Sequence, residues 1–330
     1  MSLQFMNNFR GIVILMVILV HSVSSIPDAS SFYINMLRVH LDNSTILFVA
    51  IAGYFFTILS AGYDYFPFLK NKFKAVIVPY LFISIPAVLL YILKIKPYHG
   101  WIDLEWFHGS LNPVEQYLYL IFTGAHLGPL WFVPMIILFY VFSPLFILIQ
   151  KRQGLFIAFF VSLIFGMYWG RPAFNSNALH SFVFFLPAYF LGMLLVEKKY
   201  LYESIVKNSG IFLFLYIAIA SIIYMTVEVN SSIDLVIKLV LTLVLLAFCK
   251  RYINYKVIWL DLFARLSFFL FFIHGYFTGM VRLTLRQTDI QLNEYVALFC
   301  IFPFIIFMSL LTYIVAKLAL KKRARVLIGA

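Results

Sequence analysis

Charged residues are scarce in this chain. Only 12% of its 330 residues are Asp, Glu, Lys or Arg, whereas 64% are hydrophobic. A soluble globular domain is about one-quarter charged and about half apolar. The composition therefore excludes a soluble globular domain and predicts an integral membrane protein whose first partner is the lipid bilayer.

Cysteines and buried carboxylates are also few. Cys249 and Cys300 both lie within apolar stretches, which gives neither a disulfide framework nor a metal site. No Asp or Glu lies deep in an apolar stretch, and the sequence has no internal repeat. Coupled carriers usually have midplane carboxylates and paired repeats. These absences count against a multi-span transporter or a flippase for a glycan precursor, which stays the main alternative interpretation.

Apolar stretches of about 17 to 25 residues recur along the chain, and each can cross about 30 Å of hydrocarbon. They predict about ten transmembrane helices in one all-α polytopic domain that covers residues 1–330. The predicted spans are residues 10–26, 44–63, 75–93, 130–149, 154–170, 179–196, 210–226, 233–249, 257–283 and 293–316. The shorter segment 114–125 predicts a re-entrant or interfacial helix, and the loop 94–129 that contains it is expected to form a small lid.

The net charge of +12 has a topological explanation. Most of the 25 basic residues fall in alternate connections, which a ten-span chain places on one side of the membrane. By the positive-inside rule this side is cytoplasmic, so both termini are predicted to be cytoplasmic. The charge therefore predicts a multi-pass membrane protein and does not indicate a nucleic acid partner.

Arg10 and His21 stand out among the ionisable residues of the predicted spans, because such residues are costly in lipid. Eleven residues separate them. At about 100° and 1.5 Å per residue, both side chains share one helix face and lie about 16 Å apart along the axis. Arg10 is then expected at the cytoplasmic surface, where it can bind phosphate, and His21 near mid-membrane, where it can act as a general base. The alternative is a core histidine bonded to a backbone carbonyl and an ordinary positive-inside arginine.

Several motifs resemble those of the membrane-bound acyltransferase family 3, and they occur in the family's order over nearly the whole chain. Residues 7–21 (NNFRGIVILMVILVH) are similar to the family's opening D/N-x-x-R-G-[IL]-[AV] stretch, with its His eleven residues after the Arg. Residues 48–54 (FVAIAGY) resemble F-F-x-x-S-G-[FY], with Ala52 replacing the usual Ser. The other resembling segments are the basic patch 70–74 (KNKFK), 130–133 (LWFV), 190–192 (FLG) and 267–274 (SFFLFFIH).

The resemblance implies roles for individual residues. His21 is implied to be the catalytic base and Arg10 a donor-binding residue. The basic patch, which usually has two arginines, is implied to bind the nucleotide of acyl-coenzyme A through Lys72 and Lys74. Trp131 and His274 are implied to line the cavity, although packing would explain both equally well.

The family resemblance further implies the substrates. The donor is expected to be acetyl- or succinyl-coenzyme A, with no metal, and the acceptor an extracytoplasmic or lipid-linked polysaccharide such as an exopolysaccharide.

Arg265 or Lys238 would receive a succinyl carboxylate if they faced the cavity, and Glu115 is the one carboxylate expected to orient His21. A membrane scaffold within a polysaccharide synthesis complex, which would tolerate loss of His21, is a further alternative.

Overall fold

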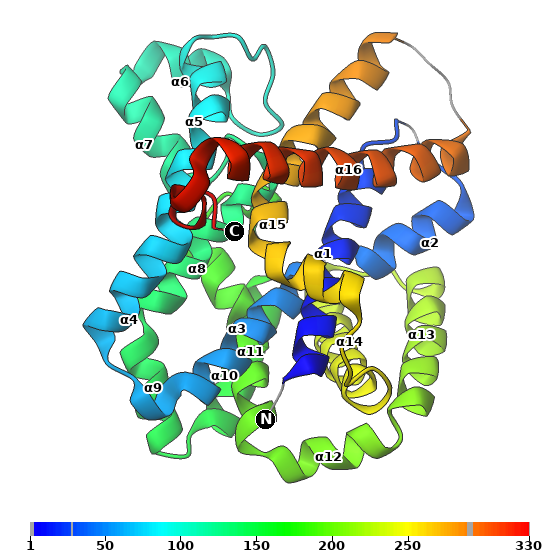
Figure 1. The fold of residues 1–330 in the computed structure, drawn as a ribbon. Coiled ribbons are helices and arrows are strands. Elements are labelled where there is room, and N and C mark those ends of the chain that lie inside the picture. Colours follow the sequence, from blue (N-terminus) through cyan, green and yellow to red (C-terminus); the bar gives the residue numbers. More distant parts are fainter. Residues whose placement is uncertain (1–2, 28, 289–292, 330) are drawn as a thin grey trace.

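The structure is a computed structural model that describes residues 3–27, 29–288 and 293–329. Within these residues all regular secondary structure is helical (Figure 1). Apolar segments in hydrocarbon adopt helices because a helix satisfies its own backbone hydrogen bonds. The prediction of an all-α membrane protein is therefore confirmed.

The long helices form the body of the molecule. They are α1 (Gln4–Val23), α3 (Thr45–Leu59), α5 (Val78–Ile92), α10 (Leu155–Trp169), α11 (Ala178–Glu197), α13 (Ser209–Thr226), α14 (Ser231–Tyr252), α15 (Ile258–Thr288) and α16 (Glu294–Leu320). Shorter helices connect or extend them: α2 (Phe32–Leu41), α4 (Tyr65–Lys72), α6 (Leu104–Ser110), α7 (Pro113–Thr123), α8 (Phe132–Val141), α9 (Ser143–Lys151), α12 (Lys199–Lys207) and α17 (Ala324–Leu327). Four 3₁₀ turns and one π-helical turn complete the set: η1 (Ser60–Gly62), η2 (Phe73–Ile77, π), η3 (Gly128–Trp131), η4 (Ala173–Asn175) and η5 (Lys321–Arg323).

Eight helical segments of the described chain are long and apolar enough to cross a membrane. A ninth arises if Pro113–Thr123 and Gly128–Val141, which meet at 76°, are counted as one broken span. This sharp bend agrees with the expectation of a re-entrant or interfacial helix over 114–125. The predicted span 154–170 corresponds to α10, which is apolar but has only 15 residues. Ten spans and the cytoplasmic termini thus stay predictions.

Helix α1 lies inside the bundle, where it packs against α15 and also touches α2, α3, α14 and α16. Its contacts with α15 advance in the same direction along both helices. Asn7 is hydrogen-bonded to Asp261 at 3.5 Å, Arg10 contacts Ser267, and Arg282 reaches the carbonyl of Ser24. The two helices therefore run parallel.

Helices α3 and α11 form the other close pair of the bundle. Gly53 of α3 faces the backbone of Tyr189, and Gly192 of α11 faces the backbone of Ala50. A Cβ atom at either glycine would collide with the facing carbonyl oxygen. Small residues allow such close approach of membrane helices, so these two glycines set the distance between α3 and α11.

The connection 94–129 folds into α6 and α7 beside the end of α5 (Figure 1). It packs with α5 around a small apolar core, to which α5 contributes Val88 and Tyr91 and the connection contributes Ile102, Phe107 and Leu120. The expected lid is thus an ordered helical cap, and whether it closes over substrate stays a prediction.

Candidate active site

His21 lies next to His274, which α15 contributes. The two imidazole rings have centroids 5.2 Å apart and planes inclined by 45°. The His21 ring is partly exposed, whereas His274 is fully buried. Two motifs 250 residues apart in the sequence, at the start of the chain and in α15, are thereby brought together.

The hydrogen bonding of His274 defines its tautomer. Its Nδ1 atom lies 2.9 Å from the carbonyl oxygen of Leu270, one turn earlier in α15. A carbonyl oxygen only accepts, so Nδ1 carries the proton and Nε2 of the neutral ring is the acceptor. This Nε2 is buried and has no hydrogen-bond partner among the described residues. An unpaired buried acceptor is costly, so it is available to a donor such as the His21 N–H or a substrate hydroxyl.

Arg10 lies on α1, on the N-terminal side of His21, and it contacts α15 on the N-terminal side of His274. Its Nε–H donates to Oγ of Ser267 at 2.8 Å. Ser267 precedes His274 by seven residues, or about two turns and 10 Å along α15. The side chain of Arg10 therefore reaches along the helix pair toward the two histidines. Its two terminal amino groups make no hydrogen bond with any described residue.

Sequence reasoning missed Ser267 as a site residue, although the serine lies in a motif that it identified. The available signal was spacing. Two residues seven apart on a helix share a face, so Ser267 and His274 repeat on α15 the arrangement of Arg10 and His21 on α1.

Aromatic residues connect His274 to Trp131. The ring of Phe271 lies 5.9 Å from His274 and 5.1 Å from Phe132, measured between centroids. The turn η3 that carries Trp131 packs directly against Gly275, where a Cβ would press on Pro129. Trp131 is thus part of the packing around His274.

Two further cations, Arg171 and Arg282, lie around this site. The guanidinium of Arg171 lies 5.7 Å from the ring centroid of Trp131. A terminal nitrogen of Arg282 lies 3.4 Å from the carbonyl of Ser24, three residues after His21.

The lysines of the basic patch do not share one environment in the structure. Lys70 and Lys72 line a cavity of about 310 Å³, together with Tyr140 and neighbouring apolar residues. The ammonium of Lys72 lies 5.2 Å from the ring centroid of Tyr140. Lys74 follows in the π-helical turn η2 and is exposed outside this cavity. The two lysines therefore have different surroundings.

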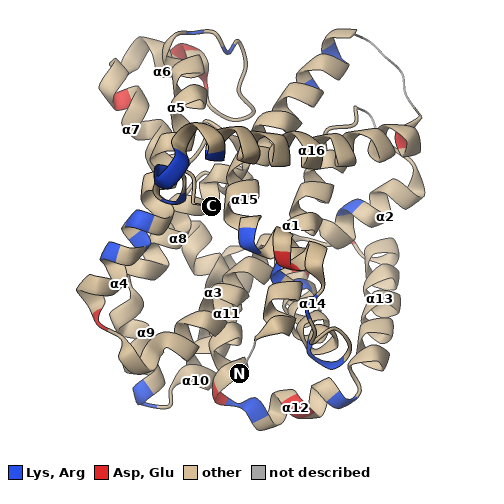
Figure 2. Cartoon of the chain, viewed as in Figure 1, with Lys and Arg blue, Asp and Glu red and all other residues tan. Residues whose placement is uncertain are grey.

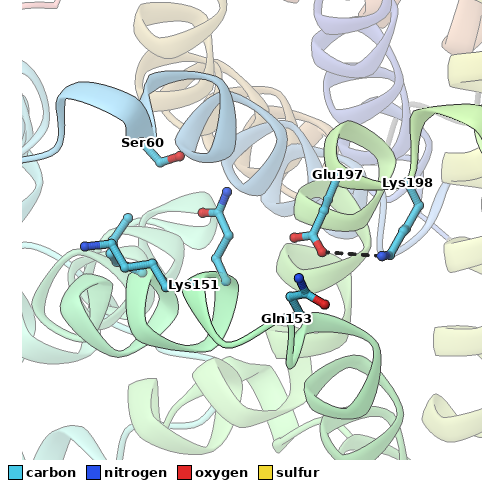
Figure 3. A pocket seen from close by; sticks show the side chains of 7 residues that line it. Ser60, Lys151, Gln153, Glu197 and Lys198 are labelled. Carbon is cyan, nitrogen blue, oxygen red and sulfur yellow. Dashed lines mark ion pairs between the residues drawn. The ribbon is translucent and has the colours of Figure 1, made fainter.

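A second cavity, of about 500 Å³, lies where α3, α9 and α11 end (Figure 3). Ser60, Lys151, Gln153, Glu197 and Lys198 line it, and the last two form an ion pair at 3.7 Å. Neither this cavity nor the one at Lys72 is lined by His21 or Arg10. A passage for a substrate between Arg10 and His21 is therefore an expectation from their shared helix face alone.

Three residues considered from sequence have other roles. The carboxylate of Glu115 accepts the backbone N–H of Asn112 at 2.8 Å and caps α7, so its position is explained without His21. The buried ammonium of Lys238 donates to the carbonyls of Val39 and His40 and pairs with Asp234. Arg265 is exposed and pairs with Asp261 at 3.4 Å. The conditional assignment of a succinyl carboxylate to Arg265 or Lys238 is therefore dropped.

Comparison with known proteins gives one match. A family model described as an acyltransferase domain matches residues 3–316. No curated protein and no solved structure matches the chain. The matched region includes Arg10, His21, Lys72, Trp131 and His274.

Proposed function

Because this chain belongs to the membrane-bound acyltransferase family 3, we propose that it moves an acetyl or succinyl group from cytoplasmic acyl-coenzyme A to a polysaccharide hydroxyl. The acceptor is an extracytoplasmic or lipid-linked glycan of the exopolysaccharide type, and the enzyme works in the bacterial cytoplasmic membrane. One arrangement supports this reaction. The parallel helices α1 and α15 hold the guanidinium group of Arg10 nearer their N-terminal ends, and the neighbouring imidazoles of His21 and His274 further along.

The chemistry assigned to His21 is general base catalysis. Its imidazole accepts the proton of the glycan hydroxyl while that oxygen attacks the thioester carbonyl. A C–O ester bond forms, the C–S bond breaks, and the proton held by His21 passes to the departing thiolate. Ester and free thiol are the two products.

His274 acts in this scheme as a positioning residue. Hydrolase bases are commonly oriented by a carboxylate, whereas the ring next to His21 is that of His274, whose buried Nε2 is an unpaired acceptor. When the N–H of His21 donates to this atom, the other ring nitrogen of His21 is left free to accept the proton of the glycan hydroxyl. The buried bond from His274 to Leu270 fixes the whole arrangement.

Arg10 is assigned to the acyl donor. Its Nε–H is held by Ser267, so its terminal amino groups are preorganised for an anion. An arginine fork suits phosphate, and the thioester arm of the same molecule would extend from there toward His21.

We expect the change Arg10→Ala to raise the KM for acyl-coenzyme A about tenfold, because a charge-assisted hydrogen bond contributes about 1.5–3 kcal/mol. Ser267→Ala is the matched control for orientation and should raise the KM less. Initial rates at varied donor concentration give both values. An unchanged donor KM in Arg10→Ala would remove Arg10 from the donor site.

The division of the basic patch leads to a second expectation. Lys72→Ala should raise the donor KM by about threefold to tenfold, since Lys72 lines the cavity beside Tyr140. Lys74→Ala should change it less, because Lys74 is exposed outside this cavity. Equal effects of the two variants in the same rate assay would show that the cavity is not what matters.

The proposed substrates are tested by mass analysis of the native surface glycan from cells with and without this protein. Loss of an acyl ester from one sugar position identifies acyl group and acceptor together. If the glycan is identical in both strains, the proposed acceptor class is wrong.

A further inference from the structure

The basic segment Lys321–Arg325 is docked against the rest of the protein. Ala324 and Ile328 are each only 3% exposed and hold the segment in place. Helix α17 lies against α5 and the π-helical turn η2, which carries Lys74. Gly329 packs on Pro79 and on the ring of Phe268, where a Cβ would lie 3.3 Å from the ring. Phe268 directly follows Ser267, the partner of Arg10.

This docking joins two groups of cations that are about 250 residues apart in the sequence. Lys321, Lys322, Arg323 and Arg325 are exposed, as are Lys70 and Lys74. None of these six pairs with a carboxylate in the described part of the chain. Figure 2 shows the blue of the basic segment next to the blue of α4, with no red between them. Unneutralised like charges held together repel each other, so the surface they form favours a multivalent anion.

The chemistry of the segment supplements that of the lysine patch. A lysine ammonium is a point charge, whereas an arginine guanidinium binds phosphate through a planar fork. The patch at 70–74 contains lysines only, and the segment adds two guanidinium groups beside it. Together the guanidinium groups of the segment and the ammonium groups of the patch suit a ligand with several phosphates.

We propose that Lys321–Arg325 and Lys70–Lys74 form one binding surface for the phosphates of the acyl-coenzyme A nucleotide. This inference rests on the proposed donor. Its geometry agrees with it, because Gly329, four residues after the segment, lies against Phe268, the residue that follows Ser267. Ser267 in turn holds Arg10, so phosphates bound at this surface would lie near the arginine assigned to the donor.

The test is a binding measurement on purified protein in nanodiscs of phosphatidylcholine, which carry no net charge. The variant Arg323→Gln/Arg325→Gln should bind coenzyme A about tenfold more weakly than the unaltered protein, because it loses two charge-assisted contacts. The matched control Lys151→Gln/Arg152→Gln removes two exposed cations from another connection and should bind normally. Coenzyme A lacking its 3′-phosphate should show a smaller difference between the unaltered protein and the arginine variant.

The outcomes separate this inference from the proposed function. Equal affinity in the arginine variant and the control overturns the inference, and acyl transfer with a normal donor KM in that variant leaves the proposed function intact. A defect seen only in nanodiscs with anionic lipid would assign the segment to lipid headgroups and also overturn the inference. If the unaltered protein neither binds coenzyme A nor transfers an acyl group, the proposed function itself fails. Arg323→Lys/Arg325→Lys keeps the charge and controls for folding, since it should elute as a single species and lose less affinity.

Discussion

Replacing His21 with alanine is expected to abolish acylation of the glycan while the protein still folds. General base catalysis contributes about 10²–10⁴-fold to a rate, so residual transfer should fall below detection in a mass analysis of the glycan. Folding should survive because the ring is partly exposed and forms no hydrogen bond with another described residue. Elution of His21→Ala as a single species from a sizing column checks this second point.

His180→Ala is the matched control for the loss of an imidazole. His180 lies at the start of α11, with Nε2 3.1 Å from the carbonyl of Gly170, and is not part of the histidine pair. This variant should keep most of its activity. Acylation that persists in His21→Ala would overturn the assignment of the base and would favour a scaffold or a carrier.

Replacing Gly53 with valine should eliminate folded protein altogether. Overpacking costs about 1–3 kcal/mol where side chains can yield, but here the obstacle is the backbone carbonyl of Tyr189, so α3 and α11 would have to separate. Since α11 also packs against α8 and α10, their separation would disturb much of the bundle. The expected result is aggregation in detergent and no glycan acylation.

Gly279→Val provides the comparison, because a Cβ at Gly279 in α15 meets nothing within 4 Å. This variant should express and elute like the unaltered protein. A stable, active Gly53→Val variant would show that α3 and α11 are less closely packed than the structure indicates.

The sequence could predict the membrane-spanning helices, because the bilayer determines them. An apolar segment long enough to cross the hydrocarbon must form a helix to satisfy its own backbone hydrogen bonds. That rule does not predict interruptions. The break between α8 and α9 at Phe142, the 76° bend before α8 and the 15-residue length of α10 leave eight or nine candidate spans in the described chain where ten were predicted.

Site residues could be predicted where one helix carries the whole pattern. Arg10 and His21 share a face of α1 by spacing alone, and the structure places both against α15. Contacts between distant segments gave no such signal. Lys238, for example, was one of several cations in spans, and only the fold shows that it is occupied by carbonyls of α2.

The lysine patch could be predicted only in part. Lys72 and Lys74 are two residues apart, so on a regular helix they point about 200° apart, which agrees with their different surroundings. The sequence does not reveal the π-helical turn that begins at Phe73. Nor does it reveal that the basic segment Lys321–Arg325 docks beside this turn.

The parallel pairing of α1 with α15 has a mechanical consequence. Because both helices are stiff, a slide of one along the other by a single residue, about 1.5 Å, would displace Arg10 from Ser267 and His21 from His274 at once. If the donor binds Arg10 as proposed, its binding and the placement of the His21 imidazole are therefore coupled through the position of one helix relative to the other.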